Sequence, residues 1–298
     1  MFGSGWTELR ARRTLDGMLR PRWNFSSRAT ELFNGDAVIL SVPKSGRTWL
    51  RTFLSAYFSY KTGRQFSLTI TDQHTPEIPR IIYSHDRFEH VTKGSAWDRL
   101  RGKYLIPLAQ IQRGPIVLLA RDPRDAFVSY FVQLTRRNPA TPSAIKQMTI
   151  DALLHHPYFG ITSMVTVMNA WMTEFGGRPN FALVRYEDLH ADAPRNFRHL
   201  LKAIGVGKID SAAFDHALNF SNFENMQQLE ASGSFGTKIL QPRNPEDPES
   251  FKVRRGKVGG FRDYLSPAGQ EYAARICATL DHRFGYPVED GAARSRDG

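Results

Sequence analysis

The chain has 298 residues, of which 41 % are hydrophobic, 23 % charged and 12 % aromatic. This composition can fill a hydrophobic core and excludes a disordered or fibrous protein. The apolar runs are far shorter than the ~20 residues that cross a bilayer, and no secretory signal is visible at the start of the chain. The single cysteine, Cys277, excludes an internal disulfide and a cysteine-based zinc site. We therefore expect a cytoplasmic protein without a transmembrane segment.

Lysine and arginine outnumber aspartate and glutamate by 40 to 29, which gives a net charge of +11. Such a surplus favours a polyanionic partner, namely nucleic acid, an acidic membrane surface or a phosphorylated small molecule. Charge alone does not choose among them. Part of the surplus lies near the start of the chain, and we predict that residues 1–30 form a basic, weakly ordered arm. Residues 31–287 would then form a single domain, and residues 288–298 a tail.

A strand, a turn and a helix follow one another after residue 36. The apolar run 37–42 is typical of a short buried strand, and residues 43–47 form a turn that contains a proline and a glycine. Apolar residues then recur with helical spacing from Leu50 to Phe58, and Gly63 ends the helix. The first unit of the domain is therefore a strand that leads into a helix through a polar turn.

The same unit recurs further along the chain. Residues 115–120 form a second apolar strand, followed by a polar turn at 121–125 and a helical pattern from Phe127 to Leu134. Residues 80–85 and 181–186 form two more strands, and a helix that ends at Gly205 follows the latter. This alternation predicts an α/β fold with a central parallel sheet and helices on both faces. Ligands of such sheets bind beyond the carboxyl ends of the strands.

Two regions lie outside this alternation. Residues 139–176 have a helical pattern, and we interpret them as an insertion that covers the sheet edge or shapes a substrate pocket. Residues 232–253 are rich in glycine and proline. A long loop of this kind in a compact domain is usually a lid or disordered, and we predict a lid.

The turn after the first strand has the layout of a phosphate-binding loop. Its sequence, Pro-Lys-Ser-Gly-Arg-Thr-Trp at 43–49, opens a helix, whose N-terminus has unpaired N–H groups and a partial positive charge. Gly46 permits close approach of the backbone, Lys44 adds a cation, and Ser45 and Thr48 add hydroxyl donors. The nucleoside triphosphate version, G-x-x-x-x-G-K-[ST], is absent, which disfavours a P-loop kinase.

Two further segments are suited to anions. Arg121 follows the second strand, in an Arg-Asp-Pro-Arg-Asp sequence, and Ser129 lies one turn into the next helix. Residues 253–262 then place four basic side chains among three glycines, a pattern typical of an anion-binding nest. Three separate anion sites suit a ligand with two phosphate positions.

Taken together, these segments resemble the cytosolic-type sulfotransferases, which use 3′-phosphoadenosine 5′-phosphosulfate (PAPS). The resemblance rests on P-K-S-G-R-T-W, on R-D-P-R-D with its following serine, and on R-R-G-K-V-G-G. Tyr-Glu-Asp-Leu at 186–189 and Ser-Asn-Phe-Glu-Asn-Met at 221–226 match further family segments in the same order. The matching region spans about residues 36–285.

The resemblance implies a role for each matching residue. The 43–49 loop would hold the 5′-phosphosulfate, with Lys44 at the bridging oxygen, and His85 would be the general base. Histidine suits proton removal from an acceptor near neutral pH, and a lysine suits the developing charge on the leaving phosphate. The remaining cofactor-binding residues would be Ser45, Gly46, Arg47, Thr48, Trp49, Arg121, Ser129, Tyr186, Ser221, Phe223, Arg254, Arg255 and Gly256. Among these, Trp49 and Phe223 would flank the adenine.

The chain departs from the family pattern at several positions. Arg47 stands where a threonine is common, and Tyr83 stands where many relatives have a lysine. Gly-Phe-Arg at 260–262 replaces the usual Asp-Trp-Lys. Many relatives have a dimer motif just beyond this segment, and here Pro267 falls inside it. The oligomeric state therefore stays open, as does the direction of the Arg47 side chain, toward the phosphate or toward the acceptor.

We interpret the protein as a sulfotransferase that moves a sulfuryl group from PAPS to an acceptor hydroxyl or amine, without a metal. The product would be adenosine 3′,5′-bisphosphate (PAP). The acceptor would be a small molecule, a lipid or a carbohydrate, and the aromatic residues Phe88, Trp97, Tyr158 and Phe159 either line its pocket or fill the core. The alternatives are a non-catalytic binder of PAPS or PAP and a basic nucleic-acid-binding protein, although no motif of the latter class is present.

Overall fold

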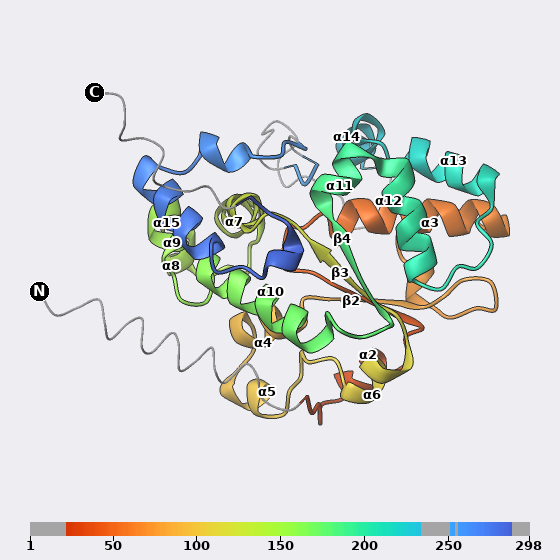
Figure 1. Cartoon of the computed structure of the whole chain (residues 1–298), viewed down its shortest axis with the longest axis horizontal. Coiled ribbons are helices and arrows are strands. Elements are labelled where there is room, and N and C mark those ends of the chain that lie inside the picture. Colours follow the sequence, from red (N-terminus) through yellow and green to blue (C-terminus); the bar gives the residue numbers. More distant parts are fainter. Residues whose placement is uncertain (1–21, 234–250, 254–255, 288–298) are drawn as a thin grey trace, which may run out of the picture.

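The computed structural model describes residues 22–233, 251–253 and 256–287. Four parallel strands form a sheet in the order β2-β1-β3-β4 (Figure 1). The strands are β1 (Ala37–Leu40), β2 (Ile81–Ser84), β3 (Ile116–Ala120) and β4 (Phe181–Arg185). All four strands that the sequence predicts are therefore present, and each is parallel to its neighbours.

Helices cover both faces of the sheet, as the alternating pattern predicts (Figure 1). Because successive side chains of a strand point to opposite faces, Val38 and Leu40 pack into one core and Ala37 and Ile39 into the other. The first core includes α7 (Pro123–Val132), α10 (Ile161–Phe175) and α15 (Pro267–Cys277). The second includes α3 (Arg47–Thr62), α12 (Ala193–Ala203) and α13 (Ser211–Phe220).

Helix α3 begins directly at the predicted phosphate loop. Two glycines in the left-handed conformation limit it, Gly46 at its start (φ 94°) and Gly63 at its end (φ 64°), a conformation that costs other residues free energy. Leu50 and Phe53 are fully buried, and the Phe53 ring stacks on Phe197 of α12 with centroids 3.9 Å apart. This packing fixes the position of the loop relative to the sheet.

Residues 139–176 differ from the predicted insertion. They form α8 (Ser143–Lys146), α9 (Ile150–Leu154) and α10, and α10 carries the helical connection between the parallel strands β3 and β4. Met164, Met168 and Trp171 are buried in the first core. The region is therefore part of the main helical layer, which a parallel pair of strands requires for its crossover.

The other elements are short, and none of the described helices is long and apolar enough to cross a membrane. A π-helical turn, η3 (Gln133–Arg137), directly extends α7. The remaining helices and 3₁₀ turns are α2 (Arg28–Phe33), η2 (Ile70–Asp72), α4 (Asp86–Thr92), α5 (Ala96–Leu100), α6 (Leu108–Arg113), α11 (Tyr186–Ala191), α14 (Phe223–Ser232), η6 (Gly260–Asp263) and η7 (His282–Phe284).

The predicted basic arm, residues 1–30, falls mostly outside the described residues. Its described part lies against the domain, because the Arg22 guanidinium is buried and forms ion pairs with Asp86 and Glu174. Most of the predicted lid, at 234–250, and the predicted tail, at 288–298, also lie outside the described residues. The predicted domain limits therefore stay predictions.

Candidate active site

A cavity of about 500 Å³ opens where the carboxyl ends of the four strands meet. This is the edge at which parallel α/β sheets bind their ligands. His85 follows β2, Arg121 follows β3 and Tyr186 follows β4, and all three line the cavity. The other predicted site residues that line it are Lys44, Gly46, Arg47, Thr48, Trp49, Ser129, Ser221, Phe223 and Gly256.

Among the described site residues that the sequence predicts, Ser45 is not part of this lining. Ser45 is buried, and its hydroxyl donates to the Val42 carbonyl oxygen at 3.0 Å. Its side chain therefore shapes the 43–49 loop rather than facing the cavity. Arg254 and Arg255 lie outside the described residues.

The 43–49 loop presents main-chain N–H groups to the cavity. Lys44 and Gly46 both have positive φ values, 72° and 94°, so the backbone reverses sharply before α3 begins. Within the described part of the chain, the N–H groups of residues 45–49 donate to no other protein group. Unpaired N–H groups at a helix start, beside a lysine, make a local site for an anion.

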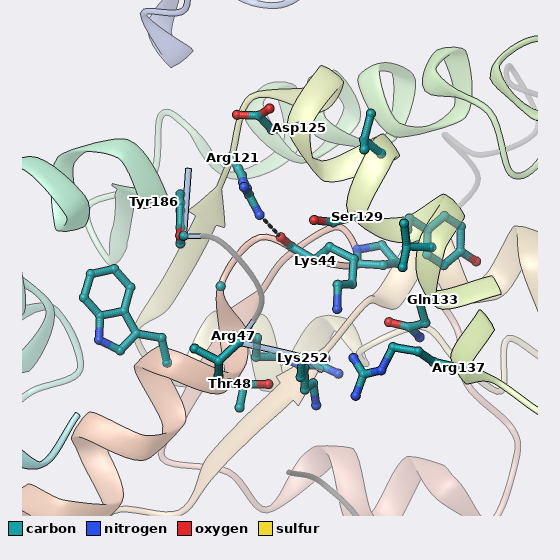
Figure 2. A pocket seen from close by; sticks show the side chains of 18 of the residues that line it. Lys44, Arg47, Thr48, Arg121, Asp125, Ser129, Gln133, Arg137, Tyr186 and Lys252 are labelled. Carbon is teal, nitrogen blue, oxygen red and sulfur yellow. Dashed lines mark hydrogen bonds between the residues drawn. The ribbon is translucent and has the colours of Figure 1, made fainter. Parts of the chain in front are cut away.

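Arg121 joins the three segments that the sequence predicts to bind anions (Figure 2). Its guanidinium donates to the Lys44 carbonyl oxygen at 3.1 Å and to the Lys257 carbonyl oxygen at 3.4 Å. The same group lies over the Tyr186 ring, 4.3 Å from the centroid. Its Nε atom is buried and has no hydrogen-bond partner among the described residues. Arg121 therefore holds the loop and the glycine-rich segment together.

Asp125 fixes the glycine-rich segment to α7, a role that sequence reasoning did not assign. Its carboxylate accepts the N–H groups of Gly259, at 2.7 Å, and Phe261, at 2.9 Å. Phe261 is buried in the first core beneath the Arg124 guanidinium. The departure from the family pattern at 260–262 is thus accommodated, because the phenylalanine fills the core and its main chain is held by Asp125.

A second carboxylate, Glu187, supports the turn that carries Arg121. It accepts the Asp122 N–H at 2.9 Å, and the Tyr286 hydroxyl donates to its other oxygen at 3.0 Å. Burial raises the pKa values of Glu187 and Tyr286. The Tyr-Glu-Asp-Leu segment carries this glutamate, but sequence spacing alone does not reveal which main-chain group it binds.

Two aromatic rings lie directly against glycines of the cavity wall. A Cβ atom on Gly46 would come within 2.6 Å of the Tyr186 ring, and one on Gly256 within 2.8 Å of the Phe223 ring. Both glycines also have positive φ values. Trp49 packs edge-on against Tyr186, with centroids 5.9 Å apart. Larger side chains at these two glycines would displace the rings.

His85 is held in one orientation at the end of β2. Its Nδ1 atom lies 2.6 Å from the Ser41 carbonyl oxygen, which can only accept, so Nδ1 carries the proton and Nε2 is left as an acceptor. Burial, and then the positive charge of Arg47, lower the pKa of His85 well below its usual value. The imidazole is therefore neutral near pH 7 and can take a proton at Nε2.

The residue after the histidine is anchored by a buried ion pair. Asp86 has a positive φ of 39° and is fully buried. Burial alone would raise its pKa, but the charge of Arg22 and hydrogen bonds from Arg22, from the Ile106 N–H and from the Trp171 indole hold the pKa below its usual value. This network fixes the start of α4 and thereby the position of His85, which directly precedes that helix.

Tyr83 does not supply the cation that many relatives have near the histidine. Burial raises the pKa of Tyr83 to about 12, and its hydroxyl lies 3.2 Å from that of Thr71. However, the Arg51 guanidinium lies over the Tyr83 ring, 4.6 Å from the centroid, and lines the cavity while pairing with Asp72. A cation is therefore present in this region, but it comes from α3.

Further cations that sequence reasoning missed line the cavity near the histidine. Arg137 lies on η3, and Lys252 lies in the short described stretch 251–253 (Figure 2). Burial, Arg137 and Arg47, in that order, lower the pKa of Lys252 to about 8. No motif marks these residues in the sequence.

Comparison with known proteins agrees with this architecture. A family model described as "Sulfotransferase domain" matches residues 34–285. The chain belongs to the sulfotransferase family. Among curated relatives, cytosolic sulfotransferase 17 of Arabidopsis thaliana is 24 % identical over 91 % of this chain and 79 % of its own length. Flavonol 3-sulfotransferase of Flaveria bidentis is 21 % identical over 91 % of this chain and 87 % of its own length.

Two solved structures share the fold. Mouse sulfotransferase SULT7A1, complexed with PAP, aligns with a TM-score of 0.55 and 19 % identity over 85 % of this chain and 89 % of its own. Retinol dehydratase, in complex with androsterone and inactive cofactor PAP, aligns with a TM-score of 0.57 and 17 % identity over 93 % of this chain and 88 % of its own. The predicted fold class and family are therefore confirmed.

Proposed function

We propose that the protein transfers a sulfuryl group from PAPS to an acceptor hydroxyl or amine, with release of PAP. One observation carries the proposal. A neutral histidine with an acceptor nitrogen lines the same cavity as Lys44 and the N–H groups that open α3. A base and an anion site in one cavity are what sulfuryl transfer to a hydroxyl needs.

The residues present fit an adenosine nucleotide with two phosphate positions. Within the described part of the chain, the N–H groups of residues 45–49 are unpaired, and the buried Arg121 Nε and Ser221 Oγ atoms lack a hydrogen-bond partner. The rings of Trp49 and Phe223 line the same cavity, and Phe223 is 39 % exposed. Lys44 would contact the bridging oxygen, and Arg121 and Ser129 the 3′-phosphate. Arg254 and Arg255, outside the described residues, stay predicted contacts of that phosphate.

In the proposed reaction, His85 takes up the acceptor proton and Lys44 stabilises the charge on the leaving phosphate. The acceptor oxygen attacks sulfur while its proton passes to Nε2 of His85, and the bond between sulfur and the bridging oxygen breaks. Lys44 stabilises the negative charge that then develops on the leaving phosphate. PAPS supplies the activated sulfuryl group, and the protein's own residues bind, orient and accept the proton. No step of this scheme uses a metal.

The acceptor remains a small molecule, a lipid or a carbohydrate in this proposal. Of the four aromatic residues that the sequence offered for its pocket, Phe88 lines the cavity. Trp97 and Tyr158 are exposed and Phe159 packs on the first core, and none of these three lines it. The name of one relative reported above, cytosolic sulfotransferase 17, supports the proposed cytoplasmic location.

Two measurements test the proposal. Calorimetric titration of the purified chain with PAP should give saturable binding, and incubation with radiolabelled PAPS and a panel of phenols, sterols, lipids and carbohydrates should give a labelled product. No heat with PAP would overturn the proposal. Binding without transfer to any acceptor would favour the non-catalytic binder. Steeply salt-dependent binding to random DNA that PAP does not compete would favour the nucleic-acid-binding protein.

A further inference from the structure

The Arg47 side chain extends toward the histidine side of the cavity. In Figure 2 it lies with Lys252, across the cavity from Arg121 and Asp125. The charged groups that influence its pKa most are Glu89 on α4 and Arg51 on α3, and Arg47 itself lowers the pKa of His85. The main chain of Arg47 thus belongs to the phosphate loop, whereas its side chain belongs to the surroundings of the proposed base.

The partly buried Arg47 guanidinium would be stabilised by an anionic partner. Burial lowers the pKa of Arg47, yet within the described part of the chain its side chain forms no hydrogen bond or ion pair. The nearby carboxylate, Glu89, already contacts the Lys93 ammonium at 2.8 Å and the Arg28 guanidinium at 3.7 Å. A partly buried guanidinium with five donors costs free energy unless an anion or several acceptors satisfy it.

Neighbouring residues make the potential around Arg47 positive. Arg137 and Lys252 come from two other segments, and Arg47 and Arg137 both lower the pKa of Lys252. The carboxylate of Glu230 contacts two of these residues, Arg137 and Lys252. It is fully buried, its oxygens accept the main-chain N–H groups of Lys252 and Val253 at 2.6 and 2.8 Å, and Arg137 lies 3.8 Å away.

We propose that the acceptor carries an anionic group, a carboxylate, sulfate or phosphate, and that Arg47 binds this group beside the base. The inference rests on the proposed function, because it concerns the acceptor of that reaction. Phe88, Leu134 and Phe251 line the same cavity, so the rest of the acceptor meets apolar side chains. A hydroxylated aromatic acid has the required combination of hydroxyl, apolar body and charge.

The competing interpretation is that Arg47 binds the phosphosulfate. Its position at the start of α3 permits this, and its replacement would then weaken PAP binding. If Arg47 instead binds the acceptor, its replacement leaves PAP affinity nearly unchanged and alters the choice between charged and neutral acceptors. The two interpretations therefore differ in a binding constant that can be measured without turnover.

The test compares 4-hydroxybenzoate with 4-hydroxybenzamide, which differ in charge but hardly in shape. For the wild-type protein we expect kcat/KM for sulfuryl transfer to be about 10- to 100-fold higher with the benzoate, the range of a charge-assisted hydrogen bond. Arg47→Thr should abolish this preference, and Arg47→Lys should keep part of it. The control is Arg113→Thr, an exposed arginine that stacks on Phe33 outside the cavity, which should keep the full preference.

Three results would overturn the inference. The first is an equal or higher kcat/KM with the benzamide in the wild-type protein. The second is a loss of PAP affinity in Arg47→Thr, which would assign the side chain to the nucleotide. The third is failure of the PAP-loaded protein both to bind and to sulfate the benzoate. The proposed function is judged separately, by PAP titration and by transfer to the acceptor panel, so its failure is distinguishable from these results.

Discussion

The cavity has two halves that are built in different ways. The half that we propose to bind the nucleotide, called the nucleotide half, consists of the 43–49 loop, Arg121, Asp125 and the described part of the glycine-rich segment. Its parts are joined through main-chain atoms. The half that we propose to bind the acceptor, called the acceptor half, consists of His85, Arg47, Arg137, Lys252 and the apolar residues beside them. Its lining is made by side chains from separate helices and loops.

This difference explains why one half leaves sequence motifs and the other does not. Main-chain contacts need glycines with positive φ and short turns at fixed spacing, as at Gly46 and Gly256. Side-chain contacts need only one suitable residue on each surrounding element, and many sequences provide it. The acceptor half can therefore change its chemistry while the nucleotide half keeps its form.

The largest expected effect comes from removing the proposed base of the acceptor half while leaving the nucleotide half intact. His85→Ala should lower kcat by about 10²- to 10⁴-fold, the usual contribution of a general base, and should leave PAP affinity unchanged in calorimetry. His90→Ala, on the helix that begins directly after His85 but outside the cavity lining, is the matched control and should retain turnover. Full activity of the His85 variant would remove the base from the proposal.

The next effect concerns the anchor beneath the acceptor half. Arg22→Met should lower the free energy of unfolding by about 3–5 kcal/mol, because it leaves the buried Asp86 carboxylate without its partner. Denaturation by urea measures this loss. Arg283→Met removes an exposed ion pair with Asp281 and should cost roughly 1 kcal/mol or less.

The pH dependence of this loss gives a second check. The folded-state pKa of Asp86 lies below its usual value, so its stabilisation is present above the unfolded-state pKa and disappears as the pH falls through the folded-state pKa. The difference between wild type and Arg22→Met should therefore shrink on acidification. A difference that grows in acid would contradict the role of this ion pair.

A smaller effect should appear when the nucleotide half is altered. Gly46→Ala should weaken PAP binding by on the order of tenfold or more, because the new Cβ would meet the Tyr186 ring and distort the loop. Gly205→Ala is a close control, since its φ of 92° matches the 94° of Gly46 but no atom lies within 4 Å of the new Cβ. Equal PAP affinities in the two variants would argue against the loop as the nucleotide site.

The smallest expected effect is a shift of the pH profile of kcat, caused by the charge of Arg47 near His85. Arg47, Lys93 and Lys252 all lower the pKa of His85, after burial, while the hydrogen bond to Ser41 raises it. Because the base must be uncharged, Arg47→Thr should raise this pKa and move the acid limb of the kcat profile to higher pH. Profiles between about pH 5 and 9 test the direction. An acid limb that stays in place would show that Arg47 does not influence the base, and one that moves to lower pH would contradict the sign of the expected effect.

Much of the fold and of the nucleotide half could be predicted from sequence for one physical reason. Buried parallel strands are short apolar runs, and a residue that directly follows such a run must lie at the ligand-binding edge. This reasoning places Arg121 at that edge, and Arg121 lines the cavity. His85 and Tyr186, which the family resemblance indicates, line it as well. The side-chain direction of Ser45 could not be predicted, because a loop serine can face a ligand or bond to its own backbone.

The remaining features depend on tertiary packing. The helical region 139–176 was misread as an insertion, because its periodicity does not reveal that α10 carries the crossover between β3 and β4. Gln133 and Arg137 reach the cavity from the π-helical turn after α7. Such turns recur at functional sites, but the sequence shows only a continued helix there.

One contact near the end of the domain has a practical consequence. Tyr286 supports Glu187, which in turn supports the turn that carries Arg121. A shortened protein that stops before residue 286 would keep every described residue of the cavity lining and still lose this support for Glu187. Boundaries for truncated or fused versions should therefore be placed beyond Tyr286, even though that tyrosine does not itself line the cavity.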